Sequence, residues 1–238
     1  MTSVTLSTTS VTGDLKQKLE KIAAAGFTGI ELNETDLIGY FGSAKNIGDI
    51  AASLGLSIEI LKPFHDFEGL SGTEHKEKFQ QLDHKLSLMG DLQAKILLIG
   101  SSTHKNASGD KEKIIEDMSK LAERVESAGF KAAYMALPWA KHIKKETQAL
   151  EIINAVNNPT LGLALNSYFS LADGSQSARL RDISGDRIFH VQLSDAPRLD
   201  FDISRLKSHF GLLPSQGGLN LESFIRVLVR KQHKREQY

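Results

Sequence analysis

A glycine that ends a helical segment and is followed by an apolar strand recurs along this chain, and this pattern restricts the fold more than any other feature. Gly26, Gly55 and Gly129 each hold this position, and strand-like segments follow at residues 27–32, 56–61 and 131–136. Such junctions are typical of repeated strand–helix units. The sequence therefore predicts an α/β protein of parallel strands joined by helices.

Seven segments have the length and apolar character of strands and alternate with helical patterns: residues 4–6, 27–32, 56–61, 94–99, 131–136, 161–165 and 187–193. No linker or low-complexity segment divides them, so residues 1–238 are predicted to form a single domain. Seven alternating units favour a TIM-type (β/α)₈ barrel over a doubly wound sheet.

The eighth strand of such a barrel is missing from the pattern. Residues 221–229 form an amphipathic helix, and the charged residues 231–238 do not resemble a strand. We therefore expect an incomplete barrel with an open edge between its first and last strands. That edge would be covered by a C-terminal segment lying irregularly over the first strand, or by homo-oligomerisation through the edge.

The composition limits the classes of partner. Lysine plus arginine and aspartate plus glutamate each total 29, so no net charge attracts nucleic acid or an anionic membrane. The absence of cysteine excludes disulfides, thiolate metal sites and a cysteine nucleophile. No apolar run approaches the ~20 residues of a membrane span, and the first residues lack a signal-peptide pattern. We expect a cytoplasmic protein that binds a small molecule.

Polar side chains follow the carboxyl ends of the predicted strands, where barrels and open α/β sheets build their sites. In the stretch 187–198, Gln192 interrupts an apolar strand and Asp195 follows its end. A buried amide needs a polar partner, so Gln192 is expected to face polar groups inside the molecule. His190, within the same strand, is predicted to be a packed or hydrogen-bonded core histidine. The candidate catalytic groups are His65, His142 and His209.

Four blocks carry a family resemblance: residues 19–32, 62–69, 136–142 and 188–200. They resemble the 3-dehydroshikimate dehydratases, which are xylose-isomerase-like barrels of the sugar phosphate isomerase/epimerase superfamily. The similarity extends over nearly the whole chain to about Phe224. It implies a lyase that dehydrates 3-dehydroshikimate to protocatechuate in quinate and shikimate catabolism. It also implies a divalent metal, Mg²⁺, Mn²⁺ or Co²⁺, that polarises the substrate carbonyl. Candidate substrate contacts within these blocks are Glu31, Trp139, Asp195 and Arg198.

The resemblance implies four metal ligands at strand ends, and this chain retains one of them. Met135 stands where the family has glutamate, Asn166 where it has aspartate, and Gln192 holds the third position unchanged. The fourth ligand, a glutamate on the last strand, has no counterpart in the C-terminal pattern. Three further family residues, implied to contact the substrate or to act in catalysis, are replaced by His65, Phe169 and Gly211.

These substitutions leave two hypotheses open. The first is an enzyme, either a dehydratase or a sugar isomerase or epimerase relative, that works with residual groups such as His65 and His142. The second is a pseudoenzyme, a non-catalytic barrel that binds a small polar metabolite. A thioether and two amides offer little to a hard dication, so we predict no bound metal cofactor and impaired or absent dehydration. A DNA endonuclease is disfavoured by the neutral charge balance and the lack of a His/Glu/Asp cluster.

Overall fold

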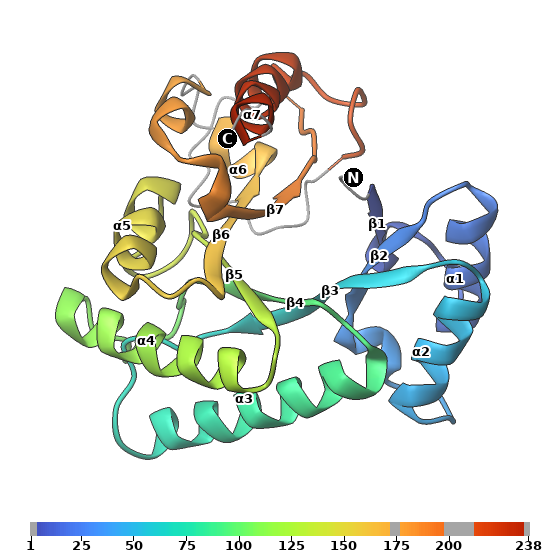
Figure 1. Cartoon of the computed structure of the whole chain (residues 1–238), viewed down its shortest axis with the longest axis horizontal. Helices are drawn as coiled ribbons and strands as arrows, with labels where there is room; N and C mark the ends of the chain where they lie inside the picture. The colour runs from blue at the N-terminus through green and yellow to red at the C-terminus, as the bar shows by residue number, and fades with distance from the viewer. Residues whose placement is uncertain (1–3, 172–176, 198–211, 236–238) are drawn as a thin grey trace.

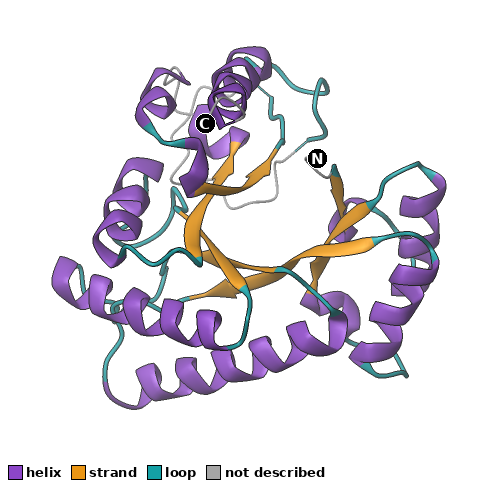
Figure 2. Ribbon diagram, in the orientation of Figure 1, coloured by secondary structure: helices purple, strands orange, loops and turns teal. Residues whose placement is uncertain are grey.

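A computed structural model describes residues 4–171, 177–197 and 212–235 of the chain. In these residues, seven parallel strands form one sheet in sequential order. The sheet curls into a half-barrel with the helices outside it (Figures 1 and 2). The strands are β1 (Thr5–Ser7), β2 (Gly29–Asn33), β3 (Ser57–His65), β4 (Ile96–Gly100), β5 (Lys131–Met135), β6 (Leu161–Asn166) and β7 (Ile188–Gln192). The predicted strand order and barrel class are confirmed.

The helices lie between successive strands and, for the last one, after β7. They are α1 (Leu15–Ala24), α2 (Ala44–Ser53), α3 (Gly72–Leu92), α4 (Lys111–Ser127), α5 (Glu146–Val156), α6 (Ser167–Leu171) and α7 (Leu221–Arg235), with short 3₁₀ helices η1 (Thr8–Ser10), η2 (Glu34–Leu37), η3 (Ser177–Asp182) and η4 (Gly185–Arg187). Gly26, Gly55 and Gly129 have φ of +83°, +72° and +79°. This left-handed conformation explains why glycine recurs at these helix ends. No helix of the described residues is long and apolar enough to cross a membrane.

The two faces of the sheet are buried in different ways. The outer face packs against the helices in the larger hydrophobic cluster, which contains Leu32, Leu97, Leu121, Ile153 and Leu163 among others. Successive strand residues point to opposite faces, so their neighbours line the interior of the barrel, here called the lumen. A smaller cluster fills the lumen with Ile60, Leu98, Ala133, Met135 and Ala164, and Phe189 packs against it. The lumen is therefore apolar over much of its length.

The barrel is open between β1 and β7. In the part of the chain that the structure describes, β1 pairs with β2 and β7 pairs with β6, and the two edge strands do not pair with each other. The gap lies between these strands in Figure 2. Residues 221–235 form α7, a regular helix that packs against η3 and η4. The expectation of an irregular segment over β1 is therefore wrong for these residues, because the helix continues past 229 to Arg235. Homo-oligomerisation through the open edge stays a prediction.

Candidate functional site

The site begins at the carboxyl end of β6, where Asn166 is held by the chain that follows it. Its side-chain oxygen Oδ1 accepts hydrogen bonds from the backbone N–H of Tyr168 at 2.9 Å and of Phe169 at 3.3 Å. It also accepts one from Ser194 Oγ at 2.9 Å. Because backbone N–H groups can only donate, these contacts fix which end of the Asn166 amide faces them. The NH₂ group must then point into the lumen.

That orientation sets the next amide. Asn166 Nδ2 donates to Gln192 Oε1 at 2.9 Å, so Gln192 presents its own NH₂ to the opposite side. Gln192 Nε2 then donates to Glu31 Oε2 at 3.0 Å. The expectation that Gln192 faces polar groups inside the molecule is confirmed.

Glu31 lies at the centre of this arrangement and is 6% exposed. Its Oε1 is 2.6 Å from His190 Nε2, and its Oε2 is 2.5 Å from Lys62 Nζ. Burial raises the pKa of Glu31, but the hydrogen bond to His190 and the charge of Lys62 outweigh burial and lower that pKa to about 2. Glu31 is therefore an ionised carboxylate in a buried position. His190 is a hydrogen-bonded interior histidine, as predicted.

Asn166, Gln192, His190, Glu31 and Lys62, here called the lumen network, connect four strands. Asn166 belongs to β6, His190 and Gln192 to β7, Glu31 to β2 and Lys62 to β3. The contacts from Glu31 to His190 and Gln192 therefore cross the open side of the barrel, where β7 and β1 do not pair. The network links side chains where the sheet provides no backbone hydrogen bonds.

Met135 lies at the end of β5 and is part of the apolar filling rather than of the network. It is 4% exposed and packs in the lumen cluster with Leu98, Leu137 and Ala164. A thioether suits this environment because it is apolar and flexible enough to fill irregular space. A glutamate at this position would need a cation or several hydrogen-bond donors.

The donor set at these strand ends does not fit the divalent metal that the family resemblance implies. Met135 is a soft ligand, and the amide oxygens of Asn166 and Gln192 already accept hydrogen bonds. The carboxylate of Glu31 is balanced by Lys62 and His190. Within residues 4–171, 177–197 and 212–235, no three His, Cys, Asp or Glu side chains are grouped so that they could hold a metal ion.

A second buried carboxylate lies outside the lumen, in the loop after β3. Glu68 Oε1 accepts hydrogen bonds from Ser102 N at 2.5 Å and from Tyr134 Oη at 2.8 Å, while its Oε2 has no partner. Burial raises the pKa of Glu68, and the hydrogen bonds from Ser102 and Tyr134 offset only part of that effect, which leaves the pKa at about 6. Burial and the adjacent Glu68 raise the pKa of Tyr134 well above its ordinary value.

The predicted catalytic histidines do not come together among the described residues. His65 ends β3 and its side chain is partly exposed. Partial desolvation and the charge of Lys78 lower the pKa of His65, against the opposing charge of Asp66. His142 Nε2 is 2.9 Å from the carbonyl oxygen of Ala107. His209, Arg198 and Gly211 lie outside the described residues.

The predicted substrate contacts have different surroundings. Glu31 is in the lumen network, and Trp139 makes an edge-to-face ring contact with Phe169 at 5.1 Å. Asp195 is 2% exposed and accepts backbone N–H bonds from Ala196, Gly217 and Leu219 at 2.8–3.0 Å. Burial raises the pKa of Asp195, but these donors lower it below its ordinary value. Its carboxylate therefore organises the turn around residue 217.

Sequence reasoning missed the roles of Lys62 and of the Glu68–Tyr134 pair. Lys62 lies inside β3 because the strand continues through the cis Lys62–Pro63 bond to His65, beyond the expected end at 61. One signal could have placed it: a lysine beside a proline at a strand end, in a chain with a glutamate at the end of the preceding strand. Nothing local marks Tyr134 as the partner of Glu68, since 66 residues separate them.

Comparison with known proteins agrees with this architecture. Residues 19–234 match the family described as Xylose isomerase-like TIM barrel. A 3-dehydroshikimate dehydratase from Pseudomonas putida is 34% identical over 224 residues, which cover 94% of this chain and 35% of that protein. The chain thus spans about a third of the length of this curated relative.

Two solved structures show the same fold. A xylose isomerase-like TIM barrel/4-hydroxyphenylpyruvate dioxygenase fusion protein superposes with a TM-score of 0.92 at 33% identity, covering 96% of this chain and 36% of that one. The IOLI protein with a bound zinc atom superposes with a TM-score of 0.84 at 22% identity, covering 97% of this chain and 85% of that one. A divalent metal therefore occurs in this fold. The chain itself belongs to the xylose isomerase-like TIM barrels.

Proposed function

We propose that this barrel binds a small polar metabolite at its strand ends without a divalent metal, and that the dehydration of 3-dehydroshikimate is impaired or lost. The name of the Pseudomonas putida relative supports dehydration of 3-dehydroshikimate as the reaction of the family. One observation carries the proposal. Asn166 and Gln192, at two of the implied metal-ligand positions, are hydrogen-bonded to each other, Gln192 is also hydrogen-bonded to Glu31, and Met135, at a third, packs in the apolar lumen.

Dehydration next to a carbonyl needs that carbonyl to be polarised and an adjacent proton to be removed. A divalent metal supplies the polarisation in such enzymes. Here Met135 and the two amides offer no anionic ligand for it. Phe169 takes the place of the family histidine, and its ring packs against Trp139 at an interplanar angle of 85°. The groups for both steps are therefore replaced by apolar or neutral side chains.

A sugar isomerase or epimerase is the second candidate, and the same donor set weighs against it. The zinc-bound IOLI structure shows that a metal site exists elsewhere in this fold. A metal-dependent isomerisation in this chain would meet the same lack of carboxylate ligands. The polar groups that remain, Lys62, Glu31 and His190, suit hydrogen bonding to hydroxyl groups.

The proposal is tested by following the ultraviolet absorbance of protocatechuate as the purified chain is mixed with 3-dehydroshikimate and Mn²⁺. We expect no turnover from the unmodified chain. The double variant Met135→Glu/Asn166→Asp should bind Mn²⁺, because it restores two anionic ligands. Turnover should stay low in that variant while Phe169 is unchanged.

The matched control is Met135→Gln, which has the length of the glutamate without its charge. It should gain no metal affinity, so that any gain in the double variant is assigned to carboxylate ligands. Turnover by the unmodified chain within the ordinary range of enzymes, about 1–10³ s⁻¹, would overturn the proposal.

A further inference from the structure

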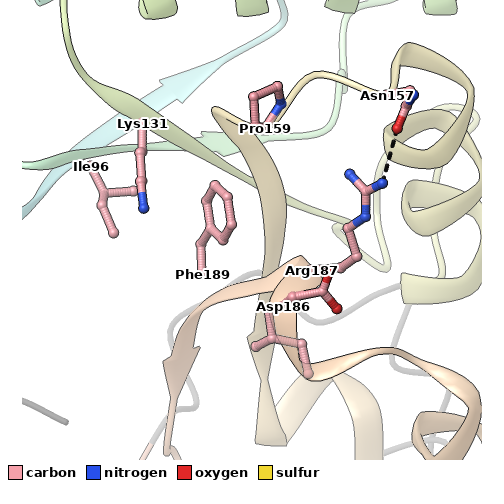
Figure 3. A pocket seen from close by; sticks show the side chains of 8 residues that line it. Ile96, Lys131, Asn157, Pro159, Asp186, Arg187 and Phe189 are labelled. Atoms are coloured by element: carbon pink, nitrogen blue, oxygen red, sulfur yellow. Dashed lines mark hydrogen bonds between the residues drawn. The ribbon is translucent and has the colours of Figure 1, made fainter. Parts of the chain in front are cut away.

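A hollow of about 640 Å³ lies at the amino ends of β4 to β7, at the opposite end of the barrel from the lumen network. Ile96, Lys131 and Ile188 are the first residues of their strands, and Pro159 lies just before β6. The volume of the hollow is within the range of ~300–1,000 Å³ that small-molecule sites have. Figure 3 shows the lining side chains around this space.

Phe189 forms the wall of the hollow toward the lumen. A Cβ on Gly162 would lie 2.3 Å from the Phe189 ring, so the ring lies directly over that glycine. The pairing register of β6 and β7 is irregular between Leu163 and Ala164, opposite Phe189. This irregularity lets the consecutive residues Phe189 and His190 both face inward. The ring separates the hollow from the lumen and presents an apolar surface to it.

Two cations line the hollow: Lys131 at the start of β5 and Arg187 at the end of η4. Lys131 Nζ lies 5.2 Å from the centre of the Phe189 ring, and Arg187 donates to Asn157 Oδ1 at 3.1 Å. Neither forms an ion pair with a carboxylate among the described residues. Asp186 is the carboxylate of the lining, and it has an interaction of its own. Within residues 4–171, 177–197 and 212–235, Lys131 and Arg187 therefore line the hollow without an ion-pair partner.

We propose that this hollow binds a small organic carboxylate that carries an apolar ring. The carboxylate lies between Lys131 and Arg187, and the ring lies against Phe189 and the aliphatic side chains of Ile96 and Ile188. The arginine fork matches the two oxygens of a carboxylate, and the lysine adds a second positive charge. The apolar walls favour a ring over a bare inorganic anion. This site is independent of the strand-end function.

The experiment titrates benzoate into the isotope-labelled full chain at low ionic strength and follows the backbone amides by NMR. We expect shifts centred on residues around Gly162 and Phe189. The double variant Lys131→Gln/Arg187→Gln should weaken binding by about tenfold or more, as expected for lost bonds to a charged group. Benzamide, which is neutral and of the same shape, should bind about tenfold more weakly than benzoate to the unmodified chain.

Two controls separate the site from general electrostatics. Lys95→Gln removes a cation at the same end of the barrel that is paired with Glu59 at 2.7 Å and does not line the hollow, so benzoate affinity should change by less than about twofold. Phe189→Leu keeps both cations and should weaken benzoate more than inorganic phosphate. Absent shifts at the hollow, unchanged affinity in the double variant, or phosphate binding as tightly as benzoate would each overturn the proposal.

Discussion

Glu31 and Glu68 are both buried glutamates near the ends of neighbouring strands, yet their pKa values differ. Glu31 is 6% exposed and has a pKa of about 2, whereas Glu68 is 3% exposed and has a pKa of about 6. Burial raises both values. Lys62 and His190 outweigh burial at Glu31, while Glu68 has the neutral donors Ser102 and Tyr134 and an oxygen without a partner. The pKa of these two buried carboxylates therefore depends on their partners more than on their depth.

The partners of Glu31 also decide whether its carboxylate can bind a divalent metal. The charge of Glu31 is already matched by Lys62 and His190, so it is not available to a divalent cation without breaking two contacts. The lumen network thus contains a carboxylate, and this carboxylate acts within the protein's own ion pairs. The hydrogen bonds at the polar end of the lumen are made by the chain's own side chains and backbone groups.

The largest expected effect comes from removing Glu31. Glu31→Ala leaves Lys62 and His190 without their partner in a buried position, so the free energy of unfolding should fall by about 3–5 kcal/mol. Urea denaturation at pH 7 measures it. The control Glu151→Ala breaks a surface pair with Lys111 and should cost less than about 1 kcal/mol. Equal effects of the two variants would remove the distinction between the network and a surface pair.

A smaller and opposite effect is expected at Glu68. Its pKa is higher in the folded chain than the ordinary 4.5, so its contribution to stability is present below about pH 4.5 and is lost as the pH rises through about 6. The loss in the free energy of unfolding is about 2 kcal/mol, because the pKa rises from 4.5 to about 6 and each pKa unit corresponds to about 1.36 kcal/mol. Glu68→Gln removes it and should stabilise the chain at pH 8 by up to this amount, with little change at pH 4.5.

The prediction is checked by measuring the urea denaturation midpoints of the unmodified chain and of Glu68→Gln at pH 4.5 and at pH 8. The contribution of Glu31 to stability depends on pH in the opposite direction. Because the pKa of Glu31 is lowered, its contribution is present above about pH 4.5 and is lost as the pH falls toward about 2. A Glu68→Gln variant that is destabilised at pH 8 would show that the ionised carboxylate has a favourable partner, and would end the contrast with Glu31.

Much of the fold could be predicted from the sequence because its signals are local. The glycines at 26, 55 and 129 need a left-handed backbone and mark where helices end. The apolar segments between such points gave all seven strands in order. The extension of β3 to His65 was not predicted, because Pro63 reads locally as a strand end.

The site could be predicted only in part because its contacts are long-range. The family resemblance predicts altered ligand positions at 135 and 166, and the apolar strand around Gln192 predicts a buried amide with a polar partner. The pairing of Glu31 with His190 joins residues 159 apart, and no local pattern specifies it. The position of Phe189 over Gly162 depends on an irregular register between β6 and β7 that periodicity does not reveal.

The most direct test of the account is the metal content and melting temperature of the purified chain. We predict no stoichiometric Mg²⁺, Mn²⁺, Co²⁺ or Zn²⁺ in the protein, and no change in melting temperature on adding a chelator or excess Mn²⁺. A ligand that does not bind the native state cannot stabilise it, whereas one present at ~100 times its Kd adds about 2.7 kcal/mol. One tightly held metal per chain, with a melting temperature that falls on chelation, would contradict the account.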